Sequence, residues 1–134
     1  MYKLACLALL AGLSSNAVAE WMQVGSNQNF TSYADPTTIQ KEGNKVMEGS
    51  RAKMVSLVDY NGVMTKAGKT YASIKVQHEF DCRQEQIRVL FYTTYAGHMG
   101  NGLAVESKFV PGNWRPVSIR SIEEVLWKIA CEKK

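Results

Sequence analysis

The sequence contains few side chains that could act as nucleophiles, general bases or metal ligands. His78 and His98 are its only histidines. A hydrolytic triad needs a histidine beside an activated serine or cysteine and an orienting carboxylate, and neither histidine has a recognisable setting of that kind. His78 lies between Val76 and Phe80 in an apolar pattern, so we expect an imidazole at the edge of the core with one hydrogen-bonded partner. His98 and Met99 share a glycine-rich turn, where a haem or metal role is the weaker reading.

Two carboxylates, Glu79 and Asp81, fall on the same side of one expected strand. Glycosidases use such a pair as acid and nucleophile. Acidic residues on a solvated strand face more often protect an edge and aid solubility, and the chain has no glycine-rich phosphate loop. The sequence therefore predicts a protein that is not an enzyme and holds no cofactor and no metal.

The N-terminus has the three parts of a secretory signal peptide. A lysine near the start precedes an apolar run at Leu4–Leu13, and Ala17-Val18-Ala19 follows as a small-residue cleavage motif. We predict cleavage between Ala19 and Glu20. The run of ten residues is about half the length that spans a bilayer, so we expect no transmembrane segment. Cys6 lies inside the run rather than after it, so we expect no lipid anchor.

Residues 1–19 are thus the predicted signal peptide and residues 20–134 a single domain. The whole chain has 16 basic and 12 acidic residues, and the signal peptide holds one lysine, so the domain carries a net charge of +3. A charge this small does not suit a nucleic-acid-binding protein of the usual kind. We expect the domain in the periplasm, at the cell surface or in the medium.

Cleavage would remove Cys6 and leave Cys82 and Cys131. Two cysteines in an oxidising compartment predict one disulfide bond. The bond would close a loop of about 50 residues and stabilise the fold by about 4 kcal/mol. A metal site would need two more donors at the same point, and no tight ligand spacing is present.

Alternating apolar and polar residues predict an antiparallel meander. The segment 72–82 should bury its even-numbered side chains, and the segment 86–96 should form a hairpin with it. In the second strand the residues expected on one face are Ile87, Val89, Phe91, Thr93 and Tyr95. Further strands are expected at 52–60 and 103–109, with a loop around 61–69 joining the first of these to 72–82, and short strands at 21–24 and 30–33.

Two segments suit helical structure. Asp35-Pro36-Thr37-Thr38-Ile39 predicts a capped helical turn with proline at its first position. Ser121-Ile122-Glu123-Glu124 predicts a capping box, in which Ser121 and Glu124 satisfy each other's backbone donors. The helix should run to about Glu132 and pack a broad apolar stripe on the sheet. The residues alone therefore predict one α+β domain, mainly β, with a twisted antiparallel sheet and a C-terminal helix.

Binding surfaces are less sharply marked. Lys66, Lys69 and Lys75 could meet a polyanion outside the cell, although scattered solvated charges are the more common reading. Leu90 and Tyr92 give their strand apolar character on a second face. That face must be covered by the helix or by another chain, so a partner surface, including a homodimer, is plausible there.

With these segments in view, the chain resembles the surface-adhesin protein E family of Gram-negative bacteria. The resemblance extends over nearly all of residues 20–134, and the paired cysteines belong to it. The matching stretches are Tyr33–Ile39 with Gly43, Leu57–Tyr60, Ser73–Lys75, Glu79–Cys82, Tyr95–Gly102, Trp114–Val117 and Leu126–Cys131.

The resemblance implies a six-stranded antiparallel sheet, bent towards a flattened open barrel, with the C-terminal helix packed on it. It also implies display on the outer membrane and binding of host matrix or serum proteins such as vitronectin and laminin, as a monomer or dimer. We therefore expect an exported binding module that uses a sheet face, an edge strand or the loop at Lys66 and Lys69. The alternatives are a periplasmic envelope protein without a host ligand and, less favoured, a haem-binding protein.

Overall fold

The computed structural model describes residues 19–42, 50–109 and 111–133. The predicted signal peptide up to residue 18, with Cys6, and Gly43 lie outside these ranges. The elements, in chain order, are β1 (Met22–Ser26), β2 (Phe30–Glu42), β3 (Arg51–Lys66), β4 (Lys69–Asp81), β5 (Gln86–Tyr95), the 3-10 turn η2 (His98–Gly100), β6 (Ala104–Phe109), β7 (Arg115–Pro116) and α2 (Ile122–Ala130).

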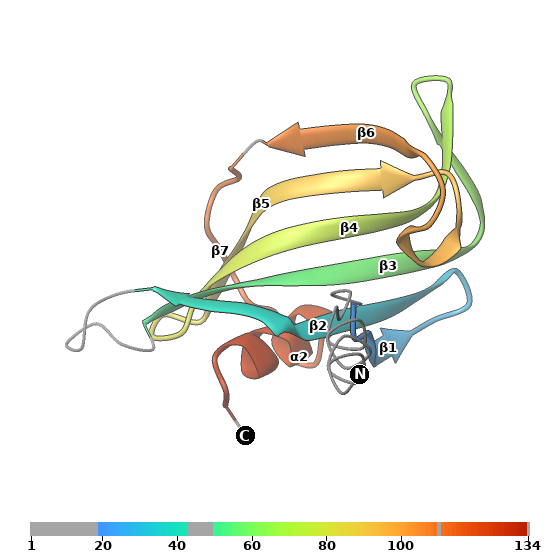
Figure 1. The fold of residues 1–134 in the computed structure, drawn as a ribbon. Helices are drawn as coiled ribbons and strands as arrows, with labels where there is room; N and C mark the ends of the chain where they lie inside the picture. The colour runs from blue at the N-terminus through green and yellow to red at the C-terminus, as the bar shows by residue number, and fades with distance from the viewer. Residues whose placement is uncertain (1–18, 43–49, 110, 134) are drawn as a thin grey trace, which may run out of the picture.

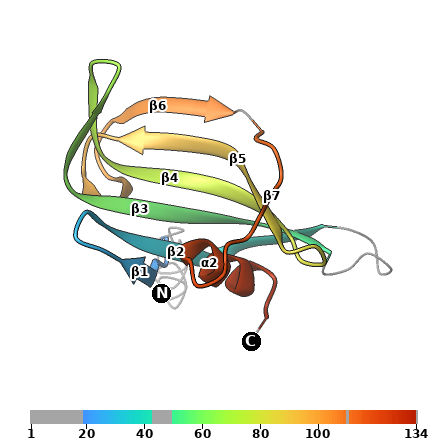
Figure 2. The ribbon, with the colours of Figure 1, turned by 180° about the vertical axis from the view of Figure 1, so that it is seen from behind.

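The predicted fold class is confirmed: six strands form an antiparallel sheet in the order β1-β2-β3-β4-β5-β6, and the short β7 pairs with β5. The sheet does not close, because β1 and β6 are its edges. Figures 1 and 2 show a strongly curved sheet. The helix α2 lies beside β2, near the edge formed by β1, and β6 forms the other edge. Within the residues described, no helix has the length and apolar character needed to cross a membrane.

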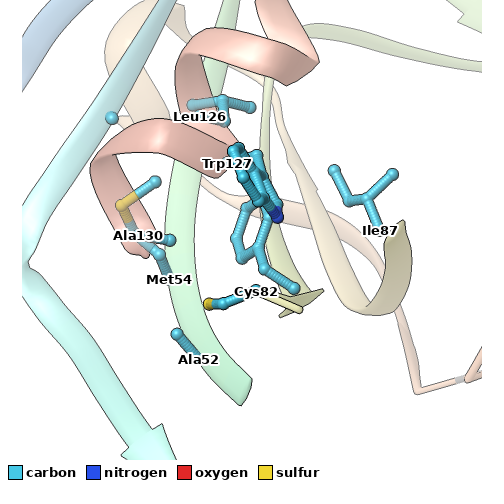
Figure 3. Close-up of a cluster of buried hydrophobic side chains, with 9 residues drawn as sticks. Ala52, Met54, Cys82, Ile87, Leu126, Trp127 and Ala130 are labelled. Carbon is cyan, nitrogen blue, oxygen red and sulfur yellow. The ribbon is translucent and has the colours of Figure 1, made fainter. Parts of the chain in front are cut away.

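The core lies between α2 and one end of one sheet face, which we call the helix face (Figure 3). Neighbouring strands align side chains across this face, because Ala52 pairs with Phe80 and Phe80 pairs with Ile87. The helix contributes Leu126, Trp127 and Ala130, all buried. Burial of this apolar surface is the main force that holds the helix on the sheet.

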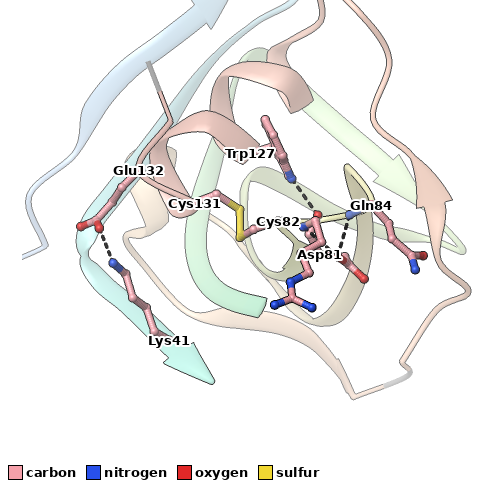
Figure 4. Close-up of a disulfide and its surroundings, with 8 residues drawn as sticks. Lys41, Asp81, Cys82, Gln84, Trp127, Cys131 and Glu132 are labelled. Carbon is pink, nitrogen blue, oxygen red and sulfur yellow. Dashed lines mark hydrogen bonds and ion pairs between the residues drawn. A yellow bond between two sulfur atoms is a disulfide. The ribbon is translucent and has the colours of Figure 1, made fainter. Parts of the chain in front are cut away.

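The predicted disulfide joins Cys82, just after β4, to Cys131 at the end of α2, with an S–S distance of 2.02 Å (Figure 4). Beside it, the indole N–H of Trp127 donates to the backbone oxygen of Asp81 at 2.9 Å. A buried indole N–H needs such a partner. The disulfide and this hydrogen bond therefore fasten the helix to the end of β4.

The predicted helix is also confirmed, although it ends at Ala130 rather than near Glu132. Its start is set by Ser121, whose hydroxyl oxygen accepts the backbone N–H of Glu124 at 3.1 Å. The reciprocal half of the capping box differs from the prediction. The carboxylate of Glu124 accepts the backbone N–H of Arg120, at 3.4 Å.

The helical turn predicted at residues 35–39 is wrong, because this segment belongs to β2. The Asp35 carboxylate accepts the backbone N–H of Thr37 at 3.0 Å, as in an Asx turn. The hydroxyl of Thr38 donates to the Asp35 backbone oxygen and accepts the N–H of Val55 on β3. The polar residues that suggested a helix cap instead shape an irregularity within a strand, since pairing with β3 resumes after it.

The expected arrangement of β5 is wrong beyond its midpoint. Gln77 pairs with Phe91, yet the next residue, His78, pairs with Val89. Leu90 is therefore an extra residue on β5, a β-bulge that reverses the alternation of side chains. The bulge therefore places three residues on the face opposite Val89, although we expected them on the same face as Val89. They are Phe91, Thr93 and Tyr95.

The loop expected around residues 61–69 is mostly strand. β3 continues to Lys66, and β4 begins at Lys69 after the turn Ala67-Gly68. Both turn residues have positive φ, 51° and 78°, as the tight turns of β-hairpins require. Glycine fits its position because it has no side chain to oppose this conformation.

Candidate functional site

The β3–β4 hairpin extends beyond the rest of the domain, and its tip stands clear of the other strands in Figure 1. Every residue from 61 to 70 is exposed, including Val63 at 68% and Met64 at 40%. An isolated two-stranded hairpin is only marginally stable in water. The pairing of its strands is interrupted between Asp59 and Met64 and then resumes in three pairs that lead to the turn: Met64–Tyr71, Thr65–Thr70 and Lys66–Lys69.

Lys66 and Lys69 lie directly opposite each other across the turn. Like charges at a cross-strand pair repel each other and reduce stability. The arrangement places two ammonium groups at the tip of an exposed projection, where an acidic partner would relieve the repulsion.

A cleft lies between one side of this hairpin and strands β5 and β6, with a volume of about 220 Å³. We call it the hairpin cleft. It occupies the helix face of the sheet, at the end away from α2, because Ile74 pairs with Thr94 on that face. Its lining residues are Lys66, Lys69, Tyr71, Ile74, Tyr92, Thr94, Val105 and Glu106.

The polar groups of the hairpin cleft interact with one another. The Tyr92 hydroxyl donates to a Glu106 carboxylate oxygen at 2.8 Å, and the ammonium of Lys66 lies 5.9 Å from the centre of the Tyr92 ring. This hydrogen bond raises the pKa of Tyr92 and lowers the pKa of Glu106, with smaller contributions to the latter from Lys108, Lys66 and Lys69. Two ammonium groups, one carboxylate and aromatic walls make a cleft suited to acidic and aromatic side chains.

The structure therefore brings together Lys66 and Lys69, the two ligand-binding residues suggested by the sequence. Tyr92 was noted only as part of an apolar second face, and Glu106 was not singled out. The signal that could have identified Glu106 is weak, because its proximity to Tyr92 depends on the pairing of β5 with β6.

His78 is buried on the helix face, 5.9 Å from the ring of Phe80. Its Nδ1 has no hydrogen-bond partner among the residues described, unlike the satisfied imidazole that we expected. Burial, and to a smaller extent the positive charge of Arg115, lower the pKa of His78 from 6.5 to about 4. The ring is therefore neutral at pH 7.

His98 lies in η2, where its Nδ1 is 3.1 Å from a carboxylate oxygen of Asp59. The same oxygen accepts the backbone N–H of Met99 at 2.9 Å, and the Ser73 hydroxyl joins the turn through hydrogen bonds to Gly97 and Gly100. These contacts hold the turn against β3 and β4. The described part of the chain contains no cluster of three or more histidine, cysteine or acidic side chains able to hold a metal ion.

Glu79 is buried, which corrects the expectation of a solvated acidic face. One oxygen of its carboxylate accepts a hydrogen bond from Arg88 Nε at 2.8 Å and forms an ion pair with Arg88 Nη2 at 2.7 Å. The guanidinium groups of Arg88 and Arg51 lie 4.8 and 5.5 Å from the centre of the Trp114 ring. Asp81 instead accepts the backbone N–H groups of the following turn, so the two carboxylates do not share a site.

The family model for surface-adhesin protein E matches residues 21–132, nearly the whole described chain. The chain belongs to the surface-adhesin protein E family. The family's expected features are present in the open six-stranded sheet, the C-terminal helix and the Cys82–Cys131 disulfide.

Solved structures with the same fold include protein E of Haemophilus influenzae. One has a TM-score of 0.65 and 13% sequence identity, with 87% of each chain covered. Protein E from non-typeable Haemophilus influenzae has a TM-score of 0.61 and 14% identity, covering 88% of this chain and 79% of the other. At such identities the likeness shows the fold alone. A search among curated proteins found no match.

Proposed function

We propose that this protein is an exported, non-enzymatic adhesin that binds a protein partner through the β3–β4 hairpin and the hairpin cleft. The observation that carries the proposal is that every residue from 61 to 70 is exposed, although the strands are paired from Met64–Tyr71 to the turn. The domain leaves all ten of these residues exposed even though the tip is held in paired strands, and a partner that covers the tip best explains this arrangement.

The chemistry of the hairpin indicates what the partner offers. Lys66 and Lys69 face each other at the tip, and Val63 and Met64 expose apolar surface beside them. An acidic segment flanked by apolar or aromatic residues would complement both features, since charge complementarity adds specificity and speeds association.

Membership of the adhesin family supports a host matrix or serum protein as this partner, and laminin and vitronectin are the first ligands to test. The location follows from the predicted export signal. In this proposal the chain is cleaved between Ala19 and Glu20 and residues 20–134 act outside the cytoplasm, in the periplasm or at the cell surface.

The experiment measures binding of the exported protein to immobilised laminin and vitronectin. Reversing both charges in a Lys66→Glu/Lys69→Glu variant should weaken binding by about tenfold or more. The control is an Arg83→Glu/Lys133→Glu variant, which makes the same change of net charge at exposed positions away from the hairpin. The control should bind like the parent, because only the hairpin charges meet the ligand.

Equal loss of binding in both variants would show that net charge alone drives adhesion. Unchanged binding in the Lys66→Glu/Lys69→Glu variant would place the contact elsewhere on the domain. Absence of binding by the parent protein to either ligand would contradict the host-ligand proposal.

A further inference from the structure

Lys75 is a partly buried cation on the face of the sheet opposite α2, which we call the open face. Its ammonium lies 5.1 Å from the centre of the Tyr95 ring and 5.8 Å from the centre of the Trp21 ring. The side chain passes close beneath Gly100, where an added Cβ would lie 2.5 Å from the lysine Cε. Aromatic rings and a glycine therefore hold the lysine in place.

Lys75 differs in its surroundings from the other lysines that have fixed partners. Lys41, Lys53 and Lys128 each form an ion pair with a glutamate. Across residues 19–42, 50–109 and 111–133, no aspartate or glutamate oxygen lies within 4.0 Å of the Lys75 ammonium. Cation–π contacts stabilise the charge in part, but they leave its N–H donors available to an anion.

A groove of about 310 Å³ is lined in part by Lys75, and its volume is within the size range of small-molecule sites. We call it the sheet groove. It carries one cation, two aromatic rings, one aliphatic side chain and two neutral polar groups. The lining residues are Val55, Lys75, Gln77, Phe91, Thr93 and Tyr95.

Apolar surface continues from the sheet groove to the edge of the sheet. Phe91 is 36% exposed, and its cross-strand neighbour Phe109 on the edge strand β6 is 70% exposed. The β-bulge at Leu90 is what turns Phe91 to this face. An extended apolar chain could thus lie from Lys75 across Phe91 towards Phe109.

A second hollow, of about 500 Å³, shares Val55 and Lys75 with the sheet groove. It also contains Asp35, whose carboxylate accepts hydrogen bonds from Thr37 and from the backbone N–H of Glu20. In the proposed mature chain this nitrogen of Glu20 is the N-terminal ammonium, so Asp35 already has a charged partner. We place an anionic ligand in the sheet groove because its lining contains a cation and no carboxylate.

We propose that the sheet groove binds an apolar monocarboxylate, such as a medium-chain fatty acid. The carboxylate accepts hydrogen bonds from the Lys75 ammonium, and the hydrocarbon chain covers Val55 and Phe91. A single lysine suits a single negative charge, because a phosphate or sulfate group is normally held by several cationic or backbone donors. This site is separate from the hairpin cleft, which lies on the helix face.

The test is calorimetric titration of the exported protein with decanoate below its micelle concentration, and with decanol as an uncharged ligand of the same chain length. Decanoate should bind about tenfold more tightly than decanol, because only the acid pairs with the ammonium. Lys75→Gln should abolish this difference, and Lys75→Arg should retain it. A Lys66→Gln/Lys69→Gln variant should bind decanoate like the parent, since its changes lie in the hairpin cleft.

Two further measurements do not depend on variants at Lys75 folding correctly. Val55→Trp should fill the groove and weaken decanoate binding. In the parent protein with ¹³C-dimethylated lysines, decanoate should shift the Lys75 resonance more than the others. The proposal is overturned if the parent does not bind decanoate at millimolar concentration or if the Lys75→Gln variant binds decanoate as tightly as the parent. Loss of decanoate binding in the Lys66→Gln/Lys69→Gln variant, with binding retained in Lys75→Gln, would also overturn it.

Discussion

At the scale of single residues, the chemistry of this protein depends on which polar groups the fold removes from water. His78 is the clearest case, because it is buried against Phe80 and its Nδ1 has no hydrogen-bond partner among the described residues. A charged imidazole would be costly there. The ring is kept neutral, and its proton affinity is linked to the stability of the fold.

Acidification should therefore weaken the fold through His78. Its pKa is about 4 in the folded protein and near 6.5 when exposed, so the unfolded chain binds the proton first. The contribution to stability is complete above about pH 6.5 and is lost as the pH falls towards 4. It amounts to about 3 kcal/mol, because each unit of pKa difference corresponds to about 1.4 kcal/mol.

Urea unfolding of the parent and a His78→Leu variant at pH 7.5 and pH 4.5 would measure this effect. The variant should lose less stability on acidification than the parent. A His98→Gln variant serves as control and should behave like the parent, because that ring lies at the surface. Parallel loss of stability in the parent and the His78→Leu variant would show that other groups account for the acid sensitivity.

At the scale of elements, α2 depends on both apolar packing and the disulfide. The helix has nine residues, which is too few for a stable isolated helix in water. Its buried side chains Leu126 and Trp127 fix it on the helix face. The Cys82–Cys131 bond ties its end to β4 across a sequence separation of 49 residues.

Removal of the disulfide should destabilise the protein by about 4 kcal/mol, as expected for a loop of this length. Cys82→Ser, Cys131→Ser and the double variant should show similar losses by thermal or urea unfolding, since each removes the same bond. Cys131→Ser is the cleaner measurement, because Cys82 is more deeply buried. Variants as stable as the oxidised parent would show that the bond contributes nothing to stability.

At the scale of the whole molecule, the packed helix and the two proposed binding sites occupy three different parts of the sheet. The helix covers one end of the helix face, the hairpin cleft occupies the other end, and the sheet groove lies on the open face. A partner bound at the hairpin would thus leave the sheet groove accessible. This separation allows the two proposed sites to be tested independently.

The location of the molecule decides whether its proposed partner comes from a host. Antibodies against the domain should label intact producer cells if the protein is a surface adhesin, and its mass should correspond to a chain that begins at Glu20 with one disulfide. Labelling seen only after permeabilisation would place the domain in the periplasm. The family name would then describe its fold, and an envelope partner would replace the host ligand.

Local patterns in the sequence were enough to predict much of this fold. The cap at Ser121, the meander from β3 to β6 and the pairing of Cys82 with Cys131 follow from short-range spacing and from the count of cysteines. The Lys66 and Lys69 pair was also visible as a candidate. These features depend on residues that are close in the chain or, for the disulfide, on the fact that two cysteines can pair in only one way.

Tertiary structure alone decided which side chains share a surface. The bulge at Leu90 moves Phe91 to the open face, and Glu79 becomes buried because Arg88 reaches it from the next strand. Lys75 acquires its aromatic neighbours from segments far along the chain. The physical reason is that all three arrangements depend on how strands and segments pair in space rather than on the sequence of one strand. At Phe91 a single extra residue on one strand reverses the alternation of period two.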